Sequence, residues 1–259
     1  MTEKLQLDEP GDGVARLTIQ NPERRGALDH EILDALAEHA RTLDARCLVI
    51  RGSGDVFSAG YDIGNLSQQD SFEDRAERLV AHPFHDALEA LEAYEYPVIA
   101  EVNGHAIGGG LELALTADIR VAASGVKMGM PPAKLGLIYS HTGLAKFIDV
   151  CGPANTAELF FVGRNVDSER AREMGLVNEV VAPDALGARV LDLAEEIASN
   201  APLSLAGNKR MIRELRALRL PEELERELVE LRESCFASED FREGVEAFTE
   251  KRKPEWRGR

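Results

Sequence analysis

The chain has 259 residues, 44% of them hydrophobic and 29% charged, with a formal net charge of −16 at pH 7. This length and composition allow a large buried core and exclude a disordered or fibrous protein. The excess of negative charge argues against binding to nucleic acid or to an anionic membrane, because both need clustered positive charge. The three cysteines are widely spaced and odd in number, so they predict buried thiols rather than a disulfide framework.

No targeting or metal-binding signal stands out in the chain. The N-terminal residues lack the basic and then apolar layout of a signal peptide, and the most apolar stretch, residues 106–123, is interrupted by charged side chains. We therefore expect a cytoplasmic protein that does not cross a membrane. GxxxxGK(S/T), HExxH and CxxC motifs are missing, so the sequence does not support a phosphate-binding loop, a zincin or a thioredoxin-like site.

Strands alternate with helices over the first two thirds of the chain. Asp29 is a suitable N-cap for a helix that runs to about Leu43, Asp62 could cap another near Ile63, and Gly175 fits a helix end. Strands are predicted at residues 14–19, 47–51, 98–102, 119–122 and 177–181. This alternation predicts an α/β fold.

Beyond about residue 185 the pattern becomes purely helical. Leucines spaced by four follow Pro221, and this apolar stripe needs to be covered by the core or by another subunit. Helices are predicted at residues 185–200, 203–218, 221–236 and 241–251. We therefore divide the chain into a core, residues 1–184, and a helical region, residues 185–259, which no proline- or serine-rich linker separates.

The most informative stretch is residues 103–112 (NGHAIGGGLE), where a predicted strand leads into a helix through three glycines. The first N–H groups of a helix lack partners within the helix and carry the positive end of its dipole, so an anionic oxygen is favoured there. Alone, the glycines could simply form a flexible turn. A second glycine-bearing turn, residues 56–63 (VFSAGYDI), follows another predicted strand, so each turn could supply one N–H to an oxyanion hole.

Five segments, taken in order, are similar to the crotonase superfamily of enoyl-CoA hydratases and isomerases. They are residues 21–28 (NPERRGAL), 57–62 (FSAGYD), 103–112, 171–177 (AREMGLV) and 248–254 (FTEKRKP). The resemblance implies a spiral of repeated β-β-α turns with a C-terminal helical region. It also implies an acyl-CoA site in which the backbone N–H groups of Tyr61 and Gly109 hold the thioester oxygen and stabilise an enolate.

The same resemblance implies how coenzyme A is held. Arg25 and Ala59 near the first turn, and Phe248 and Lys251 near the C-terminus, are the expected contacts, although a solvated basic tail is an equal explanation of Lys251. Coenzyme A then enters as part of the substrate, with no separate cofactor and no metal. A homotrimer or a dimer of trimers is expected.

One position departs from the hydratase pattern. Hydratases of this superfamily use two glutamates, one on the glycine-rich helix and one about twenty residues later. Glu112 stands at the first position, but Pro132 stands at the second and cannot transfer a proton. The next stretch, residues 137–143 (LIYSHTG), resembles methylmalonyl-CoA decarboxylase-like members, which have a tyrosine at the position of Tyr139.

Several reactions therefore stay open. The main prediction is a lyase of the enoyl-CoA hydratase type, in which Glu112 handles the proton. The alternative is a decarboxylase of a malonyl-type thioester, in which Tyr139 takes part, unless it is a loop tyrosine that only packs. An enoyl-CoA isomerase and a non-catalytic acyl-CoA binder are further alternatives.

Overall fold

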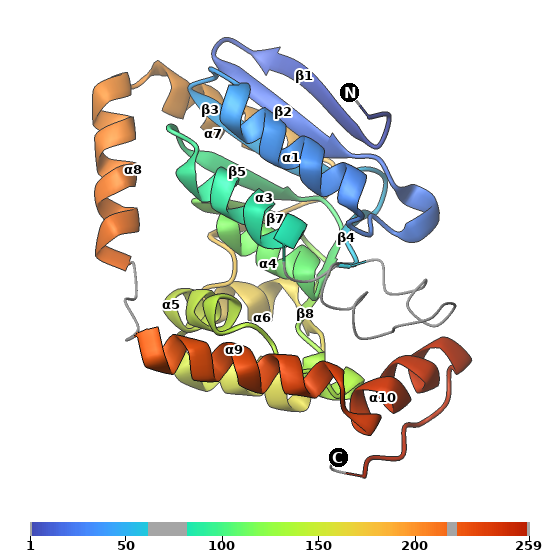
Figure 1. Ribbon diagram of the computed structural model, residues 1–259. Coiled ribbons are helices and arrows are strands. Elements are labelled where there is room, and N and C mark those ends of the chain that lie inside the picture. Colours follow the sequence, from blue (N-terminus) through green and yellow to red (C-terminus); the bar gives the residue numbers. More distant parts are fainter. Residues whose placement is uncertain (1, 62–81, 217–221, 258–259) are drawn as a thin grey trace.

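The computed structural model describes residues 2–61, 82–216 and 222–257. The predicted cap Asp62, the predicted end of a helix at residue 218 and the predicted start of the next at residue 221 lie outside these residues. Figure 1 shows the described chain as a layered α/β core with further helices beside and below it.

A six-stranded sheet forms the centre of the core. Its strand order is β1 (Leu5–Gly11), β2 (Val14–Ile19), β3 (Cys47–Gly52), β5 (Val98–Val102), β7 (Ile119–Ala123) and β10 (Glu179–Val181). Strands β1 and β2 are antiparallel and all later pairs are parallel. Every residue of β5 is buried, because a parallel sheet is covered on both faces. The strands predicted from the sequence are present in this sheet.

A smaller, four-stranded sheet lies beside the large one. Its order is β4 (Val56–Ser58), β6 (His105–Ile107), β8 (Lys127–Gly129) and β9 (Val166–Asp167). A long strand of the first sheet is followed by a short strand of the second in the pairs β3–β4, β5–β6 and β7–β8. The chain therefore winds as a spiral of β-β-α turns, which confirms the predicted fold class. The short strands were not predicted, because two or three residues carry no periodic pattern.

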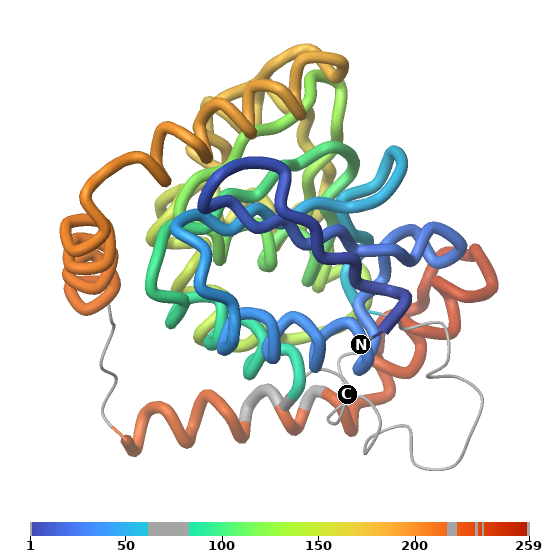
Figure 2. Tube along the Cα trace, turned by 90° about the horizontal axis from the view of Figure 1, so that it is seen from above, coloured from blue at the N-terminus to red at the C-terminus, as the bar shows by residue number. Residues whose placement is uncertain are grey.

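Helices cover both faces of the large sheet. Helices α1 (His30–Thr42) and α3 (His82–Ala93) pack against each other on one face, and α7 (Leu186–Ser199) packs on the other (Figures 1 and 2). Asp29 caps α1 as predicted, because its side chain accepts a hydrogen bond from the N–H of Ile32 at 3.0 Å. Cys47 and Cys151 are buried, and burial raises the pKa of the Cys47 thiol to about 12.

Shorter helical segments and one longer helix, α5, which is kinked at Gly152, complete the spiral. Helix α4 begins at Gly109, the second of the three glycines. The segments are η1 (Pro22–Arg24), α4 (Gly109–Thr116), η3 (Pro132–Leu135), α5 (His141–Ala157), the π-helical turn η4 (Glu158–Val162) and α6 (Ser168–Glu173). Gly175, with φ of 83°, follows α6 and ends it as predicted.

The C-terminal region contains α8 (Pro202–Arg216), α9 (Glu222–Phe236) and α10 (Glu239–Glu250). Helix α8 stands beside the core and buries none of its residues, whereas α9 passes below α5 (Figure 1). Helix α10 contacts η3 and begins two residues before the predicted start, because Ser238 caps it. Among the described residues, none of the helices is both long and apolar enough to cross a membrane.

Candidate active site

The two glycine-bearing turns lie in direct contact. A Cβ atom at Gly60 would lie 2.9 Å from the backbone nitrogen of Gly109, and one at Gly110 would overlap the carbonyl oxygen of Ser58. The Ser58 hydroxyl fixes the first turn, because it donates to the Gly26 carbonyl at 2.7 Å and accepts from the Gly60 N–H at 3.1 Å. Both turns need glycine because their backbones approach too closely for side chains.

The second turn starts helix α4. Gly108 precedes the helix with φ of 57°, a conformation that glycine adopts readily, and its N–H donates to the Gly129 carbonyl at 2.8 Å. Gly109 is the first residue of α4, so its N–H has no acceptor within the helix and lies at the positive end of the helix dipole. This geometry suits an N–H donor aimed at an anionic oxygen.

Tyr61 lies next to this N-terminus. Its backbone forms a parallel bridge with Leu28, and its ring packs against Phe84 with ring centroids 4.6 Å apart. The same ring lies 3.1 Å from the position that a Cβ at Gly109 would take. The structure thus brings together the two residues that the sequence predicts as backbone donors.

Glu112 and Tyr139 form a buried pair close by. Glu112, on the first turn of α4, is 4% exposed, and Tyr139 is 8% exposed. The Tyr139 hydroxyl donates a hydrogen bond to Glu112 Oε2. The ring of Tyr139 packs edge-on against Phe160, with centroids 5.6 Å apart. The phenol of Tyr139 therefore holds one oxygen of the buried Glu112 carboxylate.

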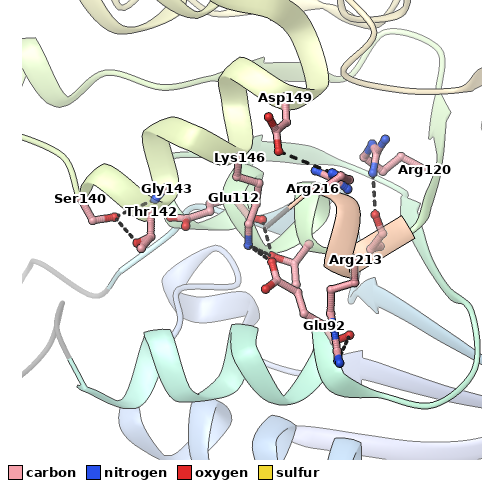
Figure 3. Close-up of polar contacts among 12 residues, drawn as sticks. Glu92, Glu112, Arg120, Ser140, Thr142, Gly143, Lys146, Asp149, Arg213 and Arg216 are labelled. Atoms are coloured by element: carbon pink, nitrogen blue, oxygen red, sulfur yellow. Dashed lines mark hydrogen bonds and ion pairs between the residues drawn. The ribbon is translucent and has the colours of Figure 1, made fainter. Parts of the chain in front are cut away.

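The start of helix α5 supports this pair. Ser140 caps the helix, and its Oγ accepts from the Gly143 N–H at 3.1 Å (Figure 3). A Cβ at Gly143 would lie 2.6 Å from Tyr139 Cε1 and 3.0 Å from Glu112 Oε1. The Glu112 side chain therefore sits at the positive end of the α5 dipole.

A cavity of about 340 Å³ opens beside the two turns. Its lining includes five predicted site residues: Ala59, Tyr61, Gly109, Tyr139 and Phe248. Its other lining residues are Ile107, Gly108, Met130, Pro131, Pro132, Lys134, Leu135, Leu137, Gly163, Asn165, Phe241 and Val245. Most of these side chains are apolar, as expected of a pocket for an acyl chain or a pantetheine arm.

The predicted coenzyme A contacts lie near the first glycine-bearing turn and at the end of α10. Ala59 lines the cavity, and its N–H donates to the carbonyl of Arg25, whose side chain is exposed. Phe248 lines the cavity and is 62% exposed. Lys251 ends α10 in the left-handed conformation, and its N–H donates to the Phe248 carbonyl, but it is not among the described lining residues.

Sequence reasoning missed several lining residues. Phe241 and Val245 precede the predicted Phe248 at helical spacing on α10, a signal from which their place in the same wall could have been predicted. Lys134 and Asn165 carry no such signal, because the spiral brings them to the cavity from η3 and from the loop after η4. Pro132, at the position of the second hydratase glutamate, is buried in the cavity wall.

His141 is not among the described residues that line this cavity. Its Nε2 lies 3.8 Å from Glu225 Oε1 on α9, and its side chain is 20% exposed. It therefore joins α5 to α9. No group of three His, Cys, Asp or Glu side chains in the described parts of the chain could hold a metal ion.

A second cavity, of about 260 Å³, lies between α3, α4, α5 and α8 and is lined by charged side chains (Figure 3). Its cations are paired with carboxylates: Lys146 with Glu92 at 2.7 Å, Lys209 with Asp118 at 2.9 Å and Arg216 with Asp149 at 3.5 Å. The Lys209 and Arg216 pairs connect α8 to the core, and the Lys146 pair connects α5 to α3. We assign the active site to the first cavity, because only it contains the glycine turns among the described residues.

The β-β-α spiral and its paired glycine turns define a protein of the crotonase superfamily. More particularly, the chain belongs to the enoyl-CoA hydratase/isomerase family, whose pattern it matches over residues 9–259. A short-chain-enoyl-CoA hydratase of Clostridium acetobutylicum is 32% identical over 93% of both chains. A probable enoyl-CoA hydratase of Bacillus subtilis is 34% identical over 95% of both.

Solved structures show the same similarity. Methylmalonyl-CoA decarboxylase in complex with 2-nitronate-propionyl-CoA aligns over all of both chains, with a TM-score of 0.88 and 28% identity. An enoyl-CoA hydratase/isomerase from Pseudoalteromonas atlantica has a TM-score of 0.82 and 30% identity, over 98% of this chain and 100% of that one. The protein is thus an acyl-CoA-processing member of a family of enzymes that act on CoA thioesters.

Proposed function

We propose that the protein is a lyase that binds an acyl-CoA thioester in the apolar cavity and adds water to, or removes it from, the carbons next to the thioester. The contact between the two glycine turns carries this proposal. It puts Tyr61 and Gly109 at the same edge of the cavity, where their N–H groups would hold the thioester oxygen. One such donor typically stabilises the developing oxyanion by about 3–4 kcal/mol.

Glu112 is the proton-transferring group in this proposal. It is buried one helical turn beyond Gly109 and lies beside the N-terminus of α5. As a carboxylate, it would take a proton from water as the water attacks, or return one to the α-carbon. Tyr139 would hold Oε2 of this carboxylate, whose Oε1 lies beside Gly143. Glu112 is not among the described residues that line the cavity, so it would act from behind the lining residue Tyr139.

Decarboxylation of a malonyl-type thioester is the second candidate. Pro132 and the Tyr139–Glu112 hydrogen bond favour it, because the cavity wall then lacks the second carboxylate of the hydratase pattern among its described residues. The similarity to methylmalonyl-CoA decarboxylase points the same way. This reaction needs the oxyanion hole and a site for the departing carboxylate, but not two proton-transfer groups.

The deciding experiment incubates the purified protein separately with crotonyl-CoA and methylmalonyl-CoA and follows the products by mass spectrometry. Gain of water by the first supports the lyase proposed here. Loss of carbon dioxide from the second supports the alternative. Tight binding of both without turnover would contradict both reactions and leave an acyl-CoA binder.

The substitution Glu112→Gln separates the two reactions further. A hydratase should lose at least about 100-fold in kcat, because its proton-transfer group is gone. A decarboxylase should keep most of its rate, since the oxyanion hole is unchanged. Steady-state kinetics of Glu112→Gln, with Glu173→Gln on the exposed surface of α6 as the matched control, measures the difference. A hydratase that keeps its full rate would contradict the role of Glu112.

Arg25 and Lys251 would bind the phosphates of coenzyme A, with Phe248 beside the adenine. Phe248 lines the cavity and is exposed, and the carbonyl of the exposed Arg25 accepts a hydrogen bond from the lining residue Ala59, which supports the assignment of these two residues. The division of the chain at residue 184 and a cytoplasmic location stay predictions from the sequence.

A further inference from the structure

One lysine enters the otherwise uncharged wall of the active-site cavity. Of the described residues that line this cavity, Lys134 alone carries a charge. It lies on η3, two residues after Pro132, so both residues belong to one turn of the wall. The cavity therefore presents a cation close to the place where the hydratase pattern has a carboxylate.

The fold holds the lysine stem in place. A Cβ at Gly163 would lie 3.2 Å from Lys134 Cε and 3.4 Å from its Cγ, so the stem lies along the Gly163 backbone. Gly163 has φ of 61° and ends η4. A larger residue there would push against the stem. The stem of Lys134 on η3 is thus packed against the backbone of Gly163 at the end of η4.

No carboxylate pairs with Lys134 among the described residues. The lysines of the second cavity behave differently: Lys146 is paired with Glu92 and Lys209 with Asp118. The chain has 46 acidic residues and a net charge of −16, so carboxylates are available as partners for most of its lysines. Lys134 is exposed to solvent and also lines the cavity. An ammonium group without an anionic partner gains when a bound molecule supplies one.

Asn165 adds a second polar group to the same wall. Its side chain lines the cavity and lies against Gly129, because a Cβ at Gly129 would meet its amide. A side-chain amide can donate hydrogen bonds to a carboxylate. Lysine and asparagine together suit a carboxylate better than a neutral alkyl chain, which would leave both of them without partners.

We infer that the protein acts on an acyl-CoA whose acyl group carries a carboxylate of its own, recognised by Lys134 with help from Asn165. The inference rests on the proposed function and names its substrate class. A cation that holds a carboxylate opposes its departure, because it stabilises the bound substrate more than the transition state for carbon dioxide loss. The recognised carboxylate is therefore one that stays in the product.

The phosphates of coenzyme A are a second possible source of negative charge. A phosphate contact would affect every CoA thioester alike, whereas a contact with the acyl carboxylate would affect only thioesters that carry one. Glutaryl-CoA and pentanoyl-CoA have acyl chains of equal length and differ in the terminal carboxylate. Neither is a substrate for hydration, so their binding can be measured without turnover.

The test measures both dissociation constants by isothermal titration calorimetry for the wild type, Lys134→Met and Lys134→Arg. We expect the wild type to prefer glutaryl-CoA by about tenfold or more, and Lys134→Met to lose this preference through weaker glutaryl-CoA binding alone. Lys134→Arg should keep most of it. Lys127→Met, which removes the same charge from an exposed residue of β8 outside the cavity lining, should leave it unchanged.

Two outcomes would overturn the inference. An equal loss of affinity for both ligands in Lys134→Met would assign the lysine to the phosphates of coenzyme A, and no change in either would remove it from the site. The inference and the proposed function can fail separately. A protein that turns over neither crotonyl-CoA nor methylmalonyl-CoA could still bind glutaryl-CoA more tightly than pentanoyl-CoA.

Discussion

Gly143 shows how much a single residue contributes to the site. It is the third residue of α5, and its missing side chain leaves the space that the Tyr139 ring and the Glu112 carboxylate occupy. A methyl group there would press on both. The local sequence gives no hint of this, since a glycine near the start of a helix usually signals only flexibility.

We predict that Gly143→Ala displaces the Tyr139–Glu112 pair and lowers kcat by about tenfold or more, because a misplaced catalytic group loses its alignment with the substrate. KM should change less, since the binding surface for coenzyme A is elsewhere. Steady-state kinetics checks this.

Gly187→Ala is the matched control for that substitution. Gly187 lies in α7 with nothing near its Cβ position, so alanine should leave kcat unchanged and stabilise the protein by about 0.5–1 kcal/mol. Equal kinetics for the two alanine variants would show that Gly143 does not position the pair.

At the scale of elements, helix α5 joins the site to the rest of the spiral. Its N-terminus faces Glu112, and its interior packs Phe147 against Phe160, which in turn contacts Tyr139. Local signals predicted the Asp29 cap and the parallel strands of the large sheet, because a cap or a buried run depends on neighbouring residues. Strand β1 and the caps Ser140, Asp167 and Ser238 were not predicted. The π-helical turn η4 and the short strands were not predicted, because only the packing of the spiral produces them.

Ser140→Ala should remove the cap of α5 and lower the free energy of unfolding by about 1 kcal/mol. It should also lower kcat, because the freed helix start no longer holds Glu112 and Tyr139 in place. Chemical denaturation and kinetics measure the two effects.

Asp167→Ala provides the comparison for the loss of this cap. Asp167 caps α6 through an equivalent hydrogen bond to the N–H of Arg170, at 2.9 Å, and is not among the described cavity residues. The Asp167→Ala variant should lose a similar amount of free energy of unfolding without a change in kcat. A parallel loss of kcat in both variants would mean that reduced stability, rather than positioning, explains the result for Ser140.

At the scale of the whole molecule, α8 carries an exposed apolar surface. Leu203 is 89% exposed, Met211 62% and Leu215 84%, although ion pairs tie the helix to the core through Lys209 and Arg216. A soluble chain rarely leaves so many large apolar side chains on one helix in water. The apolar surface and the family resemblance together suggest that other subunits cover α8.

We therefore predict a mass in solution of three or six times 28.4 kDa, measured by size-exclusion chromatography with light scattering. Leu203→Glu combined with Leu215→Glu should reduce the mass toward one subunit, because a carboxylate cannot be buried in an apolar contact without a partner. Leu7→Glu, on β1, should leave the mass unchanged. A wild-type monomer would contradict the prediction.

The sequence by itself determined the superfamily, the parallel strands of the large sheet, the capped start of α1 and the two glycine turns, because each depends on a local pattern or on residues close together in the chain. It also marked Pro132 as a departure from the hydratase pattern. Only the tertiary structure decided that Gly143 makes room for the Tyr139–Glu112 pair and that Lys134 faces the cavity. These contacts join residues from different turns of the spiral, and their distances depend on how those turns stack, which no local pattern records.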